Sequence, residues 1–220
     1  MTGQRIQPPV SAFGALQRFA RRPAVEERCE LCGSPVAPEH EHVLEVDRRR
    51  LVCACQACAI LFSGQIGQRY KRVPTRIRLL LDFRLTDAQW EGLLVPINMA
   101  FFFRSTPQAR VVALYPSPAG ATESLLAFDT WDEIVHENPP LEEMEADVEA
   151  LLVNRIGHAR GFTEPEYYIV PIDQCFKLVG LIRSRWQGLS GGTEVWQEIA
   201  EFFRSLKGSV VKGSVENAHA

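Results

Sequence analysis

Five of the six cysteines in the chain lie within residues 29–58. Four of them form two CxxC pairs, Cys29/Cys32 and Cys55/Cys58, which 22 residues separate. A tight turn can direct both thiolates of such a pair at one ion about 2.3 Å away, and four thiolates complete a tetrahedral zinc shell. Because a closed shell leaves no position for a substrate, the spacing predicts a structural Zn²⁺ site held by these four residues.

Several neighbouring groups leave other ligands and another cofactor open. An iron–sulfur cluster also takes four cysteines, so it is the alternative cofactor. Cys53 lies two residues before Cys55 on one expected strand, so their side chains would share a face and either could be the ligand. His40 and His42 share a face in the same way and could supply a nitrogen ligand, although the sequence favours solvated loop histidines. The surplus thiol of Cys53 could also serve a cluster or a transient second metal.

The segment between the two pairs predicts the element that brings them together. "HVLEVD" and "RLVCAC" alternate apolar and polar residues around the turn "DRRR", which indicates a β-hairpin. Gly33 lets the backbone fold back after Cys32, and "ACAILF" begins a short helix around Cys58. Residues 29–67 are therefore expected to form a metal-binding finger of zinc-ribbon or treble-clef-like type.

The rest of the chain is expected to hold one larger domain between two loose ends. Residues 1–28 are predicted to be a flexible N-terminal arm with one short helix over 11–20. Residues 208–220, small and polar, are predicted to be a disordered tail. Residues 68–207 are predicted to form a mixed α/β domain, so the fold class of the whole chain is α+β.

Within the larger domain, turn formers and apolar periodicity predict individual elements. Helices are expected over 85–96, over the acidic stretch 129–149, from Asp173 as the cap to Trp186, and from Gly191 to Leu206. The helix over the acidic stretch rests on the spacing of Leu141, Met144, Val148, Leu151 and Leu152. Strands are expected over 98–105, 109–117, 125–131 and 166–172, with a loop over 116–124.

Composition and charge limit the location and the partners of the chain. The net charge of −3 and the pI near 6.0 give no overall attraction to nucleic acid. The longest uncharged apolar run, residues 92–103, is shorter than the roughly 18–20 residues of a membrane helix. No continuous hydrophobic region near the N-terminus resembles a secretory signal. The protein is therefore expected to be cytoplasmic, where its thiols stay reduced, with no membrane insertion.

Residues outside the finger predict no active site. Cys175 falls in the first turn of an expected helix, where the helix dipole lowers a thiol pKa, but its neighbour Phe176 favours a buried structural cysteine. His136 and His158 stand alone in the sequence, which is typical of structural histidines. The chain is therefore expected not to be an enzyme.

Three segments together resemble an uncharacterised bacterial family, the DUF5947 type. They are "CELCG…EHEH…CACQACAILF", "PSPAGATES" and "CFKLVGLIRSRWQGLSGGTEVWQEIAEFF", and the resemblance covers about residues 25–207. Such proteins are typically encoded beside the subunits of actinobacterial-type NiFe-hydrogenases. The resemblance therefore implies a role in maturation, assembly or electron transfer, with a hydrogenase subunit or a maturation factor as partner.

These observations favour a non-enzymatic, metal-binding accessory protein for NiFe-hydrogenase maturation or assembly. It would act by docking, with the basic stretch 69–78 and the acidic stretch 129–149 as contact surfaces of opposite charge preference. The alternative is an iron–sulfur or iron-handling redox or electron-transfer protein for the hydrogenase. A further alternative, a zinc-finger nucleic-acid binder, suits the acidic pI less well.

Overall fold

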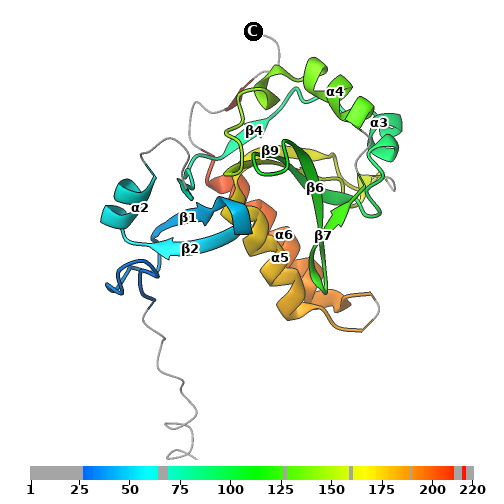
Figure 1. Ribbon diagram of the computed structural model, residues 1–220. Coiled ribbons are helices and arrows are strands. Elements are labelled where there is room, and N and C mark those ends of the chain that lie inside the picture. The colour runs from blue at the N-terminus through cyan, green and yellow to red at the C-terminus, as the bar shows by residue number, and fades with distance from the viewer. Residues whose placement is uncertain are drawn as a thin grey trace, which may run out of the picture.

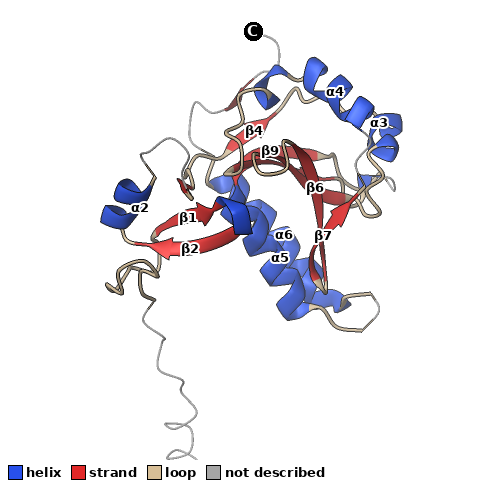
Figure 2. Cartoon of the chain, viewed as in Figure 1, coloured by secondary structure: helices blue, strands red, loops and turns tan. Residues whose placement is uncertain are grey.

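A computed structural model describes residues 27–63, 69–125, 128–158, 161–188, 190–210 and 215–216. Two β-sheets and five α-helices in this part of the chain confirm the α+β class (Figures 1 and 2). The expected helix over 11–20 lies outside the described residues. No helix among them is both long and apolar enough to cross a bilayer.

The expected hairpin forms the smaller sheet. β1 (Glu41–Glu45) and β2 (Arg50–Ala54) pair antiparallel through the 3₁₀ turn η1 (Val46–Arg48). The helix α2 (Gln56–Phe62) follows two residues after β2, as the sequence predicts. β3 (Tyr70–Arg72) pairs with the other edge of β1 and gives the order β2–β1–β3. Part of the basic stretch 69–78 is thus a strand.

The larger sheet has seven strands in the order β10–β4–β9–β8–β5–β6–β7. All its neighbours pair antiparallel except β10 and β4, which are parallel. The strands are β4 (Arg78–Leu80), β5 (Met99–Ser105), β6 (Arg110–Ser117), β7 (Gly120–Ser124), β8 (Glu149–Asn154), β9 (Glu166–Pro171) and β10 (Val215–Glu216).

Two pairs of helices cover the two faces of the larger sheet (Figure 1). α5 (Ile172–Arg185) and α6 (Gly192–Gly208) pack on one face, while α3 (Asp87–Gly92) and α4 (Phe128–Glu137) pack on the other. Strand β5 shows why both faces are apolar, since successive side chains point to opposite sides. Phe101 joins the core under α5 and α6, whereas Phe102 stacks against Trp131 of α4 with the ring centroids 5.2 Å apart.

The single helix predicted over 129–149 is wrong. α4 ends at Glu137, and Asn138 precedes Pro139 and Pro140, which lie in the 3₁₀ turn η2 (Pro139–Leu141). Proline disfavours the α conformation in the residue before it and removes a backbone donor, so the helix cannot continue. The chain then enters β8, where Leu151 and Leu152 lie in the cores on opposite faces of the sheet.

The strand predicted over 125–131 and the loop predicted over 116–124 are also wrong. β6 turns directly into β7, which lies inside the expected loop. The aromatic residues assigned to the next strand belong to α4 instead, and Trp131 faces the sheet there. The short helix α3 and the strand β9 agree with their predictions, and Thr86 caps α3 in a capping box with Gln89.

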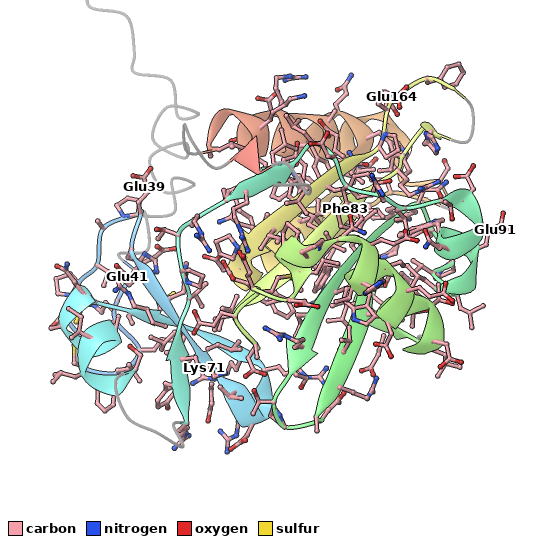
Figure 3. All side chains as sticks on the ribbon, turned by 90° about the horizontal axis from the view of Figure 1, so that it is seen from above. Glu39, Glu41, Lys71, Phe83, Glu91 and Glu164 are labelled. Atoms are coloured by element: carbon pink, nitrogen blue, oxygen red, sulfur yellow. The ribbon has the colours of Figure 1, made fainter. Side chains whose placement is uncertain are left out.

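The smaller sheet shares a core with the larger one. Leu44 of β1 and Val73 after β3 lie in the same hydrophobic cluster as Phe101. Lys71 of β3 donates a hydrogen bond to the buried carboxylate of Asp147, 2.7 Å away, and lies between the two sheets in Figure 3. The division into a finger over 29–67 and a domain over 68–207 stays a prediction, and these contacts join the two parts.

All five cations of the basic stretch 69–78 form ion pairs within the molecule, three of them with the acidic stretch. Three cations of 69–78 contact carboxylates that lie in 129–149, and two others contact carboxylates of β1. The first set is Lys71–Asp147 at 2.7 Å, Arg76–Glu149 at 3.8 Å and Arg78–Glu143 at 3.0 Å. The second set is Arg69–Glu45 and Arg72–Glu41, both at 2.6 Å. Much of the charge considered for a partner is therefore used to hold β3 and β4 in place.

Candidate metal centre

A tight turn positions the first cysteine pair. The N–H of Gly33 donates to the carbonyl oxygen of Cys29 at 2.7 Å, and the N–H of Cys29 donates to that of Ser34 at 2.8 Å. Gly33 has φ 78°, in the left-handed region that glycine adopts without strain, so the backbone can reverse directly after Cys32. The pair Cys29/Cys32 thus lies on a compact knuckle.

The second pair lies at the start of α2. Cys55 is the N-cap residue and Cys58 lies in the first turn, with the N–H of Ala59 donating to the carbonyl oxygen of Cys55 at 2.9 Å. The N–H of Glu30 donates to the carbonyl oxygen of Cys53 at 2.8 Å and ties the knuckle to the end of β2. A knuckle, a hairpin and a helix in this order make the finger treble-clef-like.

The four sulfur atoms of Cys29, Cys32, Cys55 and Cys58 come together as predicted. They all lie within 4.8 Å of one another, and the Sγ atoms of Cys32 and Cys55 are 3.8 Å apart. Four thiolates about 2.3 Å from a tetrahedral zinc ion are separated by about 3.8 Å, so this spacing fits such an ion. The donor set is consistent with zinc or with an iron–sulfur cluster.

Burial and hydrogen bonding differ among the four thiols. Hydrogen bonds with the hydroxyl and backbone of Ser34 lower the pKa of Cys32 to about 6. Burial raises the pKa of Cys58 to about 12, and hydrogen bonds with the other three cysteines add to the effect. Burial also opposes ionisation of Cys29, but hydrogen bonds from backbone groups outweigh it, so its pKa is lowered. Thiols with such different proton affinities become equivalent ligands only when a cation displaces their protons.

Cys53, His40 and His42, considered as substitute ligands, form a separate group. The Sγ of Cys53 and one ring nitrogen of each histidine lie within 4.8 Å of one another. Cys55 belongs to the four-sulfur group and Cys53 to the group with the histidines, so in this structure Cys53 does not take the place of Cys55. The rings of His40 and His42 do share a face, with their centroids 4.8 Å apart.

Asp173 has a different role from the one predicted. α5 begins at Ile172 after Pro171, and Asp173 makes no capping hydrogen bond. Its carboxylate instead lies 3.1 Å from Nδ1 of His42, and this hydrogen bond raises the pKa of the histidine. The sequence carries no local signal for a contact between residues 131 positions apart.

The remaining candidates are structural groups or isolated side chains. Cys175 is fully buried, and burial raises its pKa well above the ordinary value, so it is the buried cysteine that was expected. Nε2 of His158 lies 3.5 Å from Asp87 at the surface. His136 lies in the last turn of α4.

Comparison with known proteins gives one match. The sequence profile of a family described as "Family of unknown function (DUF5947)" matches residues 28–210. Neither the curated proteins nor the solved structures contain a match. The matched range includes both cysteine pairs and most of the larger sheet.

Proposed function

We propose that the chain, which belongs to the DUF5947 family, is a metal-binding accessory protein whose four cysteines hold a structural zinc ion. The observation that carries the proposal is the gathering of four sulfurs within 4.8 Å, two from a knuckle and two from the start of α2. This spacing supports one ion rather than a cluster of several metal atoms. A complete protein shell supports a structural role, because it leaves no coordination position for a substrate.

The small core of the finger also supports a structural ion. In the part of the chain that the structure describes, its own buried cluster has six residues, and two of them are ligands: Cys29, Val43, Val52, Ala54, Cys58 and Ala59. So small a cluster offsets only part of the conformational entropy of ordering the knuckle and the helix. In small domains of this kind metal binding supplies the missing folding free energy.

Elemental analysis of protein purified without oxygen tests the identity of the metal. After dialysis against a weak chelator, we expect about one tightly bound zinc per chain and a colourless solution. A brown protein that contains iron and acid-labile sulfide would instead establish the iron–sulfur alternative. Protein that folds fully without any bound metal would refute both.

The protein acts, in this proposal, by docking on a subunit or a maturation factor of a NiFe-hydrogenase, the role implied by the family resemblance. An exposed apolar surface on the finger supports docking: Ile60, Leu61 and Phe62 of α2 are 58%, 70% and 46% exposed. Contiguous exposed apolar side chains are typical of protein interaction sites. Nucleic acid is not proposed as the partner, because carboxylates of this chain hold several cations of the basic stretch.

Substitution of Leu61 tests the docking surface. Leu61→Asp places a charge in the apolar patch and should reduce co-purification of the hydrogenase partner at least tenfold, while the zinc content stays unchanged. Leu125→Asp is the matched control, because Leu125 is 87% exposed after β7, outside the finger. Equal loss in both variants, or no hydrogenase partner bound by the wild type, would contradict this part of the proposal.

A further inference from the structure

A second group of metal-ligating side chains lies on the hairpin beside the four sulfurs. His42 and Cys53 face each other directly in the register of β1 and β2, and His40 precedes β1. Their sulfur and ring nitrogens lie within 4.8 Å of one another. We propose that His40, His42 and Cys53 form a second metal site, which binds one exchangeable divalent transition-metal ion. The proposal does not depend on the identity of the ion in the four-sulfur site.

Both histidines are held through Nδ1. Nδ1 of His40 lies 2.8 Å from the carbonyl oxygen of Ala37 and 3.4 Å from a carboxylate oxygen of Glu27. Nδ1 of His42 lies 3.1 Å from Oδ2 of Asp173. A histidine that binds a metal ordinarily donates its other ring N–H to a carbonyl or carboxylate, which fixes both the tautomer and the ring. This arrangement therefore leaves Nε2 of each ring with a lone pair for an ion.

The buried Nε2 atom of His40 is the main indication that a group binds at this site. The side chain of His40 is 7% exposed, and its Nε2 is buried without a hydrogen-bond partner in the described part of the chain. A buried polar atom without a partner destabilises the folded state, so such atoms are rare unless a bound group satisfies them. A metal ion held between Nε2 and the thiolate of Cys53 would supply that partner.

The site opens into a groove, which makes the ion exchangeable. His40, His42 and Cys53 line a groove of about 1060 Å³, together with Glu41, Asp173 and other residues of β1 and α5. Three protein ligands leave at least one coordination position for water or another small ligand, unlike the closed shell of four cysteines. A set of two imidazoles and one thiolate suits ions of intermediate softness such as Zn²⁺, Co²⁺, Ni²⁺ or Cu²⁺.

Cys53, His42 and Asp173 lie in a row that also resembles the cysteine, histidine and carboxylate of thiol enzymes. A metal site explains the position of His40 as well, which a thiol enzyme does not. The N–H of Cys53 donates to a carboxylate oxygen of Glu30 at 2.9 Å, so an acidic group lies beside this residue, whereas a nucleophilic thiolate needs electropositive surroundings. A bound dication would offset this carboxylate. A thiol enzyme would also leave the buried Nε2 of His40 without a function.

Cobalt binding to the zinc-loaded full chain tests the proposal. After dialysis against a weak chelator, we expect one equivalent of Co²⁺ to bind with a thiolate-to-cobalt charge-transfer band, while elemental analysis shows the original zinc retained. His40→Ala and Cys53→Ser should each weaken cobalt binding at least tenfold, and Cys53→Ser should also abolish the charge-transfer band. His158→Ala is the matched control for removal of a histidine and should bind as the wild type.

Asp173 is a positioning residue in this proposal. Asp173→Asn keeps the size of the side chain but removes the charge that orients His42, and loss of such a partner weakens metal affinity about 10–100-fold. We expect a loss in this range with the charge-transfer band retained, because Cys53 still binds the ion. Unchanged affinity in Asp173→Asn would remove Asp173 from the site.

Protection of Cys53 provides a test on the wild-type protein, independent of the folding of any variant. Bound Co²⁺ should slow the alkylation of Cys53 by iodoacetamide at least tenfold, measured by mass spectrometry of the Cys53 peptide. Three results would overturn the proposal: no cobalt bound in excess of the zinc, binding unaffected by His40→Ala and Cys53→Ser, or fast alkylation of Cys53 that cobalt leaves unchanged. The last result would favour the thiol-enzyme arrangement.

Discussion

Replacement of Cys55 by serine is expected to release the tightly bound zinc ion and to unfold the finger. Cys55 contributes one of four sulfurs directly before the first residue of α2, so its replacement opens the shell at the point where the helix begins. Zinc binding to finger peptides is worth on the order of 10 kcal/mol, which far exceeds what a cluster of six buried residues supplies. We expect the zinc content to fall from about one per chain to near zero. The amide hydrogens of α2 and the knuckle should lose their protection and exchange at rates typical of unfolded chain.

Cys53→Ser is the matched control for this variant. It also removes a thiol, only two residues away, but Cys53 belongs to the group with His40 and His42 and not to the four sulfurs. This variant should keep its zinc and its protection from exchange, and lose only the exchangeable ion. A Cys55→Ser protein that stays folded and retains its metal would contradict the structural site, whatever the result at Cys53.

The finger could be predicted from sequence because its determinants are local. Two CxxC pairs, a glycine after the first pair and an alternating hairpin all lie within about 35 residues, and each fixes its neighbours directly. The register of the hairpin could not be predicted in the same way. Counting outward from the predicted turn "DRRR" pairs Asp47 with Arg50 and His42 with Cys55, whereas the structure pairs Glu45 with Arg50 and therefore places His42 opposite Cys53.

The contact between Asp173 and His42 could not be predicted from sequence either. Asp173 comes to His42 only because α5 packs beside the smaller sheet, and no spacing rule relates two residues 131 positions apart. An aspartate at the start of a helix is also a common cap, so local reasoning favoured the wrong role. Contacts of this kind depend on the assembled fold.

In the acidic stretch 129–149, the helical spacing of apolar residues predicts one continuous helix, but two prolines within the stretch prevent it. Leu141, Met144 and Val148 are all buried, as the helical spacing requires, but they lie in a 3₁₀ turn and in the irregular segment that leads into β8. The spacing of apolar residues predicts which positions are buried, but different backbone conformations can bury the same positions. The pair Pro139 and Pro140 was the stronger signal, because proline acts on the backbone itself.

Asp147→Ala is expected to cost about 3–5 kcal/mol of stability, because it removes a buried carboxylate together with its ion pair to the partly exposed Lys71 and its hydrogen bonds from Thr106. Oδ1 of Asp147 accepts from the N–H of Thr106 at 2.7 Å, and Oδ2 accepts from the Thr106 hydroxyl at 2.6 Å and from Lys71 at 2.7 Å. Asp147 also has φ 72°, a conformation that aspartate and asparagine tolerate better than alanine. Urea unfolding followed by circular dichroism measures the loss.

Two further variants separate the charge from the backbone effect. Asp147→Asn keeps the tolerance of positive φ and one acceptor for Thr106, so it should cost about 1–3 kcal/mol. Lys71→Met removes the ammonium group that Asp147→Ala leaves unpaired, so the double variant should lose less stability than the sum of the two single variants. Additive losses would show that Lys71 and Asp147 are not coupled.

The zinc content of Asp147→Ala tests whether the zinc ion or the contact with the larger sheet stabilises the finger. The four ligands all lie within 29–58, whereas Lys71 and Asp147 join β3 to the segment before β8. If the ion stabilises the finger, zinc should stay bound while amide exchange in β3 becomes faster. Loss of zinc together with β3 protection would instead mean that the contact with the larger sheet is needed to form the metal site.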